Sequence, residues 1–313
     1  MNLWTQADAN KRRSVFLILG FVVFVVAVGW LISYYYSSPV ILFVAIIVAV
    51  VQSLVSYFSG DKIVLAASGA REIAKKDNPL LWNVVENLAI TAGLPQPKVY
   101  IIPDEAPNAF ATGRDPEHAS VAVTSGLLGR LEKKELEGVI AHEMSHVGNF
   151  DIRLMTIVAI LVSVVALVSQ IFVRAQWFGF GGRNRSENEG GGSGVMAILG
   201  IVAIILAPIV AMIVQLAISR KREFLADADG ALLTRYPDGL ADALTKISRY
   251  SEPVRRVSSA TAHLYISNPL GGGEDPTSPE GLRGARKQST LSKLFSTHPP
   301  IAERIKILRG MDV

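Results

Sequence analysis

Four long apolar runs constrain the fold of this 313-residue chain more than any other feature of its sequence. They cover residues 15–36, 40–58, 154–173 and 195–218, in a chain whose mean hydropathy is +0.35. Each run holds about twenty residues, the length that an α-helix needs to cross the hydrocarbon core of a bilayer. The sequence therefore predicts a multi-pass α-helical membrane protein with two transmembrane hairpins.

Each run has an alternative interpretation. The first could be a cleavable signal peptide, but it is long for the apolar core of such a peptide and no convincing small-residue cleavage site follows it. The third and fourth could be buried helices of a soluble core. Their length and the near absence of charge favour membrane spans.

Basic residues flank the apolar runs on one side. Residues 11–13, Lys62 and residues 220–222 would all lie on one face of the membrane if all four runs cross it. Loops rich in lysine and arginine remain in the cytoplasm. The segment 174–194 carries three arginines against two glutamates, which is a weaker bias. We expect a protein of the cytoplasmic (inner) membrane whose active site faces the cytoplasm.

The parts outside the runs have the mixed patterns of an α+β domain. An amphipathic helical pattern begins at Pro79, and the stretches PKVYIIPD and HASVAVT alternate like strands. The expected order along the chain is a hairpin in 1–58, the first part of the domain in 59–153, a hairpin in 154–218 and the second part of the domain in 219–313. Glycine-rich stretches at 181–194 and 271–289 indicate a flexible surface loop and a mobile loop.

Composition excludes several classes of function. The chain has no cysteine, so disulfides and thiolate metal sites are excluded, and a zinc site would need histidine and carboxylate ligands. The net charge is only +4, and no basic stripe is interleaved with aromatic residues. Nucleic acid is therefore not an expected partner.

The stretch VIAHEMSHV, residues 139–147, carries the strongest chemical signal. On a helix, His142 and His146 lie about 40° apart on one face, where one metal ion can bind both imidazoles. Glu143 stands beside them and can reach a metal-bound water. This HExxH spacing is typical of zinc hydrolases, although so short a pattern also occurs by chance. The helical periodicity of the preceding EKKELEGVIA supports the metal site.

A catalytic zinc usually takes three protein ligands, so a third is required. Glu223 follows the fourth apolar run and would lie near the same membrane face as the HEMSH helix. Asp227 stands one helical turn later and could accept a hydrogen bond from the non-ligating nitrogen of a zinc-bound histidine. From the residues alone, an ordinary solvated helix charge is an equally good interpretation of Glu223.

Four motifs in order, HEMSH, PNAFATG, SRKREFLADADG and FSTHPP, resemble those of the HtpX family of membrane zinc metalloproteases. The chain is more distantly similar to the CAAX prenyl proteases. The resemblance covers most of the chain, including the four apolar segments. With the composition, it implies a mostly α, multi-pass α-helical membrane protein with an α+β zincin-like metalloprotease domain.

The resemblance also implies roles for individual residues. His142, His146 and Glu223 would bind one Zn²⁺ per chain, Glu143 would be the general base and acid, and Asp227 would orient a ligand. HtpX-like enzymes act in the quality control of bacterial cytoplasmic membrane proteins. The expected partners are therefore protein substrates, chiefly membrane proteins, and the lipid bilayer; an oligomer is left open.

Two further residues are candidates for substrate contacts. Asn108, in PNAFATG, resembles a family position thought to contact the substrate backbone, and its alternative is a turn residue after Pro107. His298, in STHPP, could donate a hydrogen bond to the oxyanion formed when water attacks the peptide carbonyl. Its alternative is a histidine that simply leads into the last helix.

The expected function is that of a zinc endopeptidase. The strand that contains Val121 and Val123 would hold the substrate as an added β-strand, which recognises backbone without demanding a particular sequence. One rival is a membrane scaffold or holdase with a structural metal site. Another is a CAAX-type prenyl-peptide protease, which would need a larger enclosed chamber than four apolar runs can build.

Overall fold

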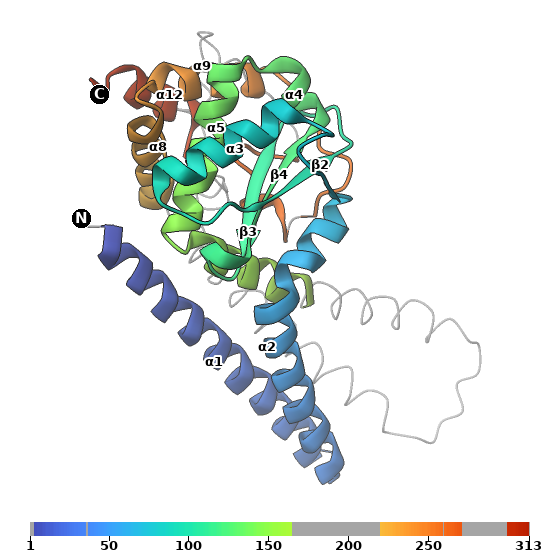
Figure 1. Cartoon of the computed structure of the whole chain (residues 1–313). Coiled ribbons are helices and arrows are strands. Elements are labelled where there is room, and N and C mark those ends of the chain that lie inside the picture. Colours follow the sequence, from blue (N-terminus) through green and yellow to red (C-terminus); the bar gives the residue numbers. More distant parts are fainter. Residues whose placement is uncertain (1–2, 36, 165–219, 259, 271–298, 313) are drawn as a thin grey trace.

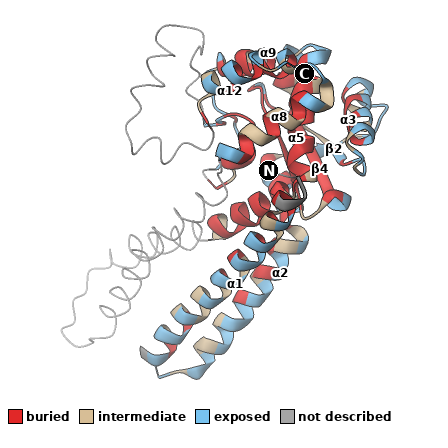
Figure 2. Cartoon of the chain, turned by 90° about the vertical axis from the view of Figure 1, so that its left-hand side faces the viewer, coloured by how far each residue is buried: buried red, intermediate tan, exposed pale blue. Residues whose placement is uncertain are grey.

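Two long N-terminal helices project from an α+β domain in the computed structural model (Figure 1). The structure describes residues 3–35, 37–164, 220–258, 260–270 and 299–312. Helices α1 (Leu3–Tyr35) and α2 (Pro39–Ser68) are both long and apolar enough to cross a membrane. Their outward apolar side chains are exposed, as Figure 2 shows by colour, which suits contact with lipid. The two predicted N-terminal spans are confirmed.

Both helices are longer than the apolar runs that predicted them. α1 includes the charged residues before residue 15, and α2 continues ten residues beyond Phe58 to Ser68, where Gly69 caps it with a φ of +72° that suits glycine. At 1.5 Å per residue, 33 residues span about 50 Å, more than the roughly 30 Å of a bilayer core. The N-terminal turns of α1 therefore extend beyond the core, towards the domain.

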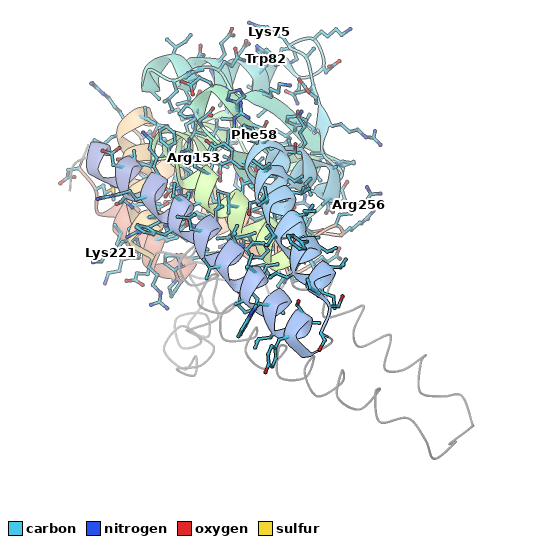
Figure 3. All side chains as sticks on the ribbon, turned by 90° about the horizontal axis from the view of Figure 1, so that it is seen from below. Phe58, Lys75, Trp82, Arg153, Lys221 and Arg256 are labelled. Atoms are coloured by element: carbon cyan, nitrogen blue, oxygen red, sulfur yellow. The ribbon has the colours of Figure 1, made fainter. Side chains whose placement is uncertain are left out.

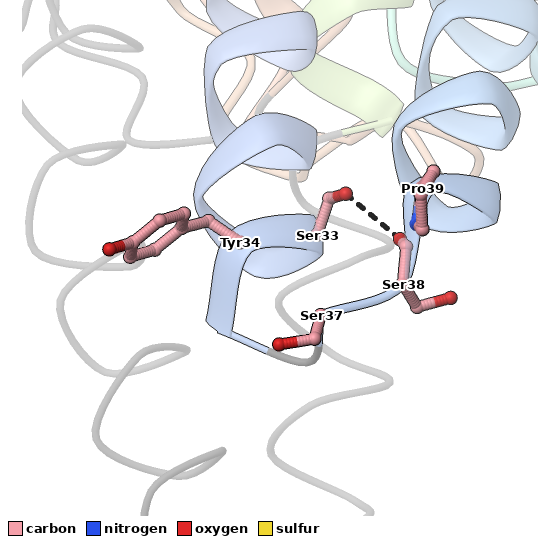
Figure 4. Close-up of a pocket in the computed structure, with 5 residues that line it drawn as sticks. All are labelled: Ser33, Tyr34, Ser37, Ser38 and Pro39. Carbon is pink, nitrogen blue, oxygen red and sulfur yellow. Dashed lines mark hydrogen bonds between the residues drawn. The ribbon is translucent and has the colours of Figure 1, made fainter.

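A tight turn closes this hairpin (Figure 4). The hydroxyl of Ser33 donates to the carbonyl of Ser38 at 2.8 Å, and the Ser38 amide donates to the Ser33 carbonyl at 3.0 Å. Pro39 then begins α2, where its fixed φ suits the first helical turn. The chain consequently returns to the side of the membrane from which α1 started.

The sheet has four strands in the order β1-β2-β4-β3. Their bounds are Arg71–Glu72 for β1, Lys98–Ile102 for β2, Ala109–Gly113 for β3 and Ala119–Thr124 for β4. β4 pairs in parallel with β2 and antiparallel with β3. The prediction that the strand of Val121 and Val123 receives substrate at a sheet edge is therefore wrong. Both sides of β4 are already paired, and the edge strands of the sheet are β1 and β3.

Helices cover the sheet and form the core with it. They are α3 (Pro79–Ala92), α4 (Ser125–Arg130), α5 (Lys133–Gly148), α8 (Arg220–Thr234), α9 (Pro237–Ser248) and α12 (Ile301–Arg309), with short 3-10 turns at Pro116–His118 and Ala262–Leu264. α5 lies at the centre, in contact with α3, α8, α9 and β3, and is buried over most of its length (Figures 1 and 2). The prediction of a mostly helical protein with an α+β domain is confirmed.

The third apolar run begins in a helix, Asp151–Val164, that is bent by 84° from α5. Its side chains pack against Leu17 and Phe21 of α1 and Leu65 of α2, so this part is buried within the protein. The Cζ atom of Arg153, which is labelled in Figure 3, lies 5.6 Å from the centroid of the Tyr57 ring on α2. The second half of this run lies outside the described residues, as do the run 195–218, the segments 181–194 and 271–289, and His298. The crossing of the second hairpin stays a prediction.

Candidate metal centre

Helix α5 presents two imidazoles on its buried face. A capping box starts the helix, in which Glu132 and Glu135 each bond the other's backbone amide. His142 and His146 follow on one face, with their ring centroids 4.8 Å apart and their planes at 89°. Their Nε2 atoms are 3.2 Å apart, so both rings point to one place.

Helix α8 brings a carboxylate to the same place. Glu223 Oε1 lies 3.6 Å from Nε2 of His146, and Oε2 lies 3.9 Å from Nε2 of His142. The two helices approach closely at Gly230, where an added Cβ would lie 3.0 Å from the His142 amide nitrogen. Because glycine has no side chain there, α8 can lie close enough to α5 for Glu223 to join the histidines.

The spacing of these donors suits one metal ion. The ligand atoms of His142, His146 and Glu223 all lie within 4.8 Å of one another. A tetrahedral zinc with ligands at about 2.0–2.1 Å has donor atoms about 3.3 Å apart. The separation of 3.2 Å between the two Nε2 atoms is close to that value, and the two Glu223 oxygens, one 3.6 Å from His146 and the other 3.9 Å from His142, lie slightly further away. Two imidazoles and a carboxylate are also ligands that zinc prefers, so the residues fit Zn²⁺.

A buried ion pair lies behind His142. Asp227 Oδ1 is 2.9 Å from Nδ1 of His142, the nitrogen that points away from the donor cluster. Arg304 of α12 donates to both oxygens of Asp227, at 2.7 and 2.8 Å, and to the Ile266 carbonyl at 3.0 Å. Arg304 is fully buried, and its guanidinium lies 3.8 Å from Glu223. It therefore compensates the charge of two carboxylates at the site.

A second carboxylate lies behind His146. Asp151 Oδ2 is 3.0 Å from Nδ1 of His146, and Asp151 is itself buried. Each histidine thus has a carboxylate at Nδ1 and directs Nε2 to the donor cluster. Such partners orient metal-binding imidazoles and select the tautomer.

Sequence reasoning missed two of these residues. Arg304 stands on the apolar stripe formed by Ile301, Ile305 and Leu308 of the last helix, and a charge in that stripe is a signal of a buried partner. Asp151 follows His146 by five residues, beyond the end of α5, where helical spacing gives no guidance.

Burial and charge act differently on the two histidines. Burial lowers the pKa of His142 to about 4, despite the carboxylate of Asp227 beside it. Burial acts in the same direction on His146, but the hydrogen bond to Asp151 and the charge of Glu223 raise its pKa to about 9. At neutral pH without metal, His142 is therefore neutral, and His146 holds a proton that metal binding would release.

Glu143 is buried beside the donor cluster. Burial raises its pKa to about 7, and the nearby charge of Glu223 acts in the same direction. Its carboxylate accepts a hydrogen bond from the backbone of Ala111 in β3. A carboxyl group with a pKa near 7 can both accept and donate a proton at neutral pH, as a general acid–base group must.

The other predicted site residues are placed less directly. Asn108 is buried, and its Nδ2 donates to the carbonyl of Ser267 at 3.0 Å while its Oδ1 accepts from the Ala109 amide at 3.1 Å. The Asn108 side chain thus holds the segment around Ser267 next to β3. Its contact with substrate stays a prediction. The role of His298, which lies outside the described residues, also stays a prediction.

Comparison with known proteins identifies the family of this chain. The model of peptidase family M48 matches residues 75–312. The chain belongs to peptidase family M48. Among M48 proteins it is 49% identical over 306 residues to a Protease HtpX homolog of Tropheryma whipplei (strain Twist), with 97% of each chain covered. It is 43% identical over 310 residues to a Protease HtpX homolog of Caldanaerobacter subterraneus, and the match covers 98% of this chain and 97% of that homolog.

A solved structure extends the comparison to the fold. The crystal structure of S. mikatae Ste24p matches at a TM-score of 0.50 and 18% sequence identity, over 98% of this chain and 66% of Ste24p. At that identity the likeness concerns the fold alone. The M48 and HtpX matches carry more: the predicted family is confirmed, and this M48 member is a membrane metalloprotease, a hydrolase of peptide bonds that depends on a metal.

Proposed function

We propose that this M48 metalloprotease is a zinc endopeptidase that cuts misfolded or damaged membrane proteins at the cytoplasmic face of the inner membrane. The observation that supports it best is the convergence of His142, His146 and Glu223, with Glu143 beside them. Three ligands leave a coordination position for water, whereas structural zinc sites are usually closed by four protein ligands. Among the described residues, the cluster contains three ligands, which favours catalysis over a scaffold with a structural metal.

The chain's own residues divide the catalytic work. His142, His146 and Glu223 hold the metal, and Asp227 and Asp151 accept hydrogen bonds from Nδ1 of the two histidines. Bound zinc supplies a Lewis acid that polarises the carbonyl and acidifies water. Glu143 takes the proton of the attacking water and passes it to the leaving amine. Its raised pKa, about 7, suits both steps.

The edge strand β3 is the surface that we assign to the substrate backbone. The Asn108 carbonyl accepts from the Thr124 amide of β4, so the backbone groups of Ala109 and Ala111 point away from β4. The Ala109 amide donates to Asn108 Oδ1, the Ala109 carbonyl accepts from the Ile266 amide, and the Ala111 amide donates to Glu143. The Ala111 carbonyl is therefore the acceptor that we assign to the substrate. Ala111 lies next to Glu143. A substrate backbone amide that donates to the Ala111 carbonyl would hold the neighbouring peptide bond near the general base without recognising side chains, which suits a protease with many damaged substrates.

Orientation in the membrane has a direct test, because the chain has no native cysteine. The basic residues before residue 15 and Lys62 favour a cytoplasmic domain. A single cysteine in place of Lys76, in the domain, should react with a membrane-impermeant maleimide only after cells are opened. One in place of Ser37, in the α1–α2 turn, should react from outside the inner membrane. The reverse pattern would overturn the proposed orientation.

The chemistry is tested with a matched pair of glutamates on α5. Glu143→Gln should keep one zinc per chain and lose cleavage of casein, because the amide cannot take a proton from water. Glu137→Gln changes a partly exposed glutamate that pairs with Lys133, and should keep both. A chelator should abolish wild-type cleavage and added zinc should restore it. Full activity of Glu143→Gln, or a wild type without bound zinc, would refute the proposal.

A further inference from the structure

The turn after the metal-binding helix returns the chain to its own active site. Residues 149 and 150 join α5 to the helix Asp151–Val164, which is bent by 84° from it. Phe150 has a φ of +57°, a left-handed conformation that few residues other than glycine adopt. This turn brings Asp151 to 3.0 Å from Nδ1 of His146. The orientation of that metal ligand therefore depends on how firmly the turn is held.

The first membrane helix holds this turn. Asn10 of α1 is fully buried, and its Nδ2 donates to the Asn149 carbonyl at 2.9 Å and to Asp151 Oδ1 at 2.7 Å. Both hydrogens of one amide are thereby used on the turn. The next residue, Lys11, lies 4.2 Å from the centroid of the Phe150 ring. Two consecutive residues of α1 thus contact both residues of the turn and Asp151, the first residue of the next helix.

The contacts form a continuous path from α1 to the metal ligand. Asp151 Oδ1 faces Asn10 and also lies 3.3 Å from Nε of Arg222, while Oδ2 faces His146. A buried carboxylate keeps one orientation only when its oxygens are bonded on both sides. Asn10 provides the shortest of these bonds, and it comes from a helix 141 residues away in sequence.

We propose that Asn10 is a positioning residue for the metal ligand His146, so that metal affinity depends on the docking of the first membrane helix against the domain. The proposal rests on the zinc site assigned above. Asn10 acts through Asp151 and does not itself contact the metal ligands. A chain whose first helix is displaced would keep its ligands but bind zinc more weakly.

Substitutions at Asn10 distinguish a donor from a packing residue. Replacing a direct hydrogen-bond partner of a metal ligand typically costs about 10–100-fold in metal affinity. Asn10 is one bond further away, so Asn10→Ala should cost about tenfold at most. Asn10→Asp has nearly the same shape but puts a carboxylate oxygen 2.7 Å from Asp151, where a donor stood. Asn10→Asp should therefore lose more zinc affinity than Asn10→Ala. If Asn10 only fills space, Asn10→Ala should lose more.

The experiment measures zinc dissociation constants of the full-length protein in detergent at pH 8, by competition with a chromophoric chelator. The control is Ser14→Ala, because Ser14 is buried one turn further along α1 and its hydroxyl donates to the Asn10 carbonyl within the helix. The d–d absorption of the cobalt-substituted protein reports ligand geometry. We expect affinity to fall in the order wild type, Asn10→Ala, Asn10→Asp, with a changed cobalt spectrum and an unchanged Ser14→Ala.

A double-variant cycle with Asp151→Asn tests the path. In that background Asn10→Ala should add little further loss, since both act through one carboxylate. Wild-type affinity in both Asn10 variants, or equal losses at Asn10 and Ser14, would overturn the proposal. So would a lower melting temperature of the metal-free protein without a change in affinity. A wild type that binds no zinc would instead refute the proposed zinc site, so the two failures are distinguishable.

Discussion

Removing the buried guanidinium at the metal centre should destabilise the protein far more than removing a surface one from the same helix. Arg304→Met deletes two hydrogen bonds to Asp227, at 2.7 and 2.8 Å, and leaves that carboxylate buried without its cation. Breaking a buried pair in this way costs about 3–5 kcal/mol. Arg309→Met removes an ion pair with Asp242 at 3.1 Å, in which both side chains are about half exposed. Such pairs contribute about 0–1 kcal/mol.

Thermal unfolding in detergent, followed by the fluorescence of the four tryptophans, measures the difference. For a protein of this size, 1 kcal/mol changes Tm by about 2–4 °C. Arg304→Met should therefore lower Tm by about 6–20 °C, and Arg309→Met by at most about 4 °C. Equal Tm values for the two variants would refute the assignment of Arg304 as the compensating charge.

A second substitution separates the charge effect from the loss of contacts. Replacing both partners of a buried pair with apolar residues is often neutral for stability. The double variant Arg304→Met with Asp227→Leu should thus regain most of the lost Tm. Its zinc affinity should stay low, because His142 has lost its acceptor at Nδ1. A double variant less stable than Arg304→Met alone would contradict this account.

Three further outcomes are expected from thermal unfolding. Gly138→Ala should cost about 1–3 kcal/mol, because its Cβ would lie 2.6 Å from the Leu240 nitrogen, whereas Gly129→Ala has open space and should stay near wild type. Zinc at a hundred times its dissociation constant should add about 2.7 kcal/mol, and an unchanged Tm would contradict a native metal site. Burial raises the pKa of Asp227, but Arg304 outweighs it and holds the value at about 2, below the ordinary 3.8. This carboxylate therefore stabilises the fold at neutral pH, and that contribution is lost as the pH falls from about 4 to about 2. The Tm deficit of Asp227→Asn should shrink over that range, and a constant deficit would contradict the shift.

The sequence alone predicted the elements whose signal lies between near neighbours. Apolar length predicted α1 and α2, because crossing a bilayer requires about twenty apolar residues in succession. Four-residue spacing placed His142 and His146 on one face, because helical geometry depends only on the residues of one turn. Where the sequence was wrong or incomplete, the missing information was not local. Strand pattern identified β4 as a strand but could not place it inside the sheet, since strand order depends on which edges meet.

Only the tertiary structure decided what surrounds the metal ligands. Asp227 and Arg304 are separated by 77 residues, and Asn10 and Asp151 by 141, so no helical or strand period relates them. Asn10 even stands in the polar stretch QADANKRR, where a buried side chain is not expected. A buried charge or amide must find its partner wherever the packed elements bring one, because an unpaired polar group costs too much to bury. The two histidine ligands and the apolar segments can thus be predicted from local sequence patterns. The groups that orient and neutralise the ligands are determined by the packing of distant elements.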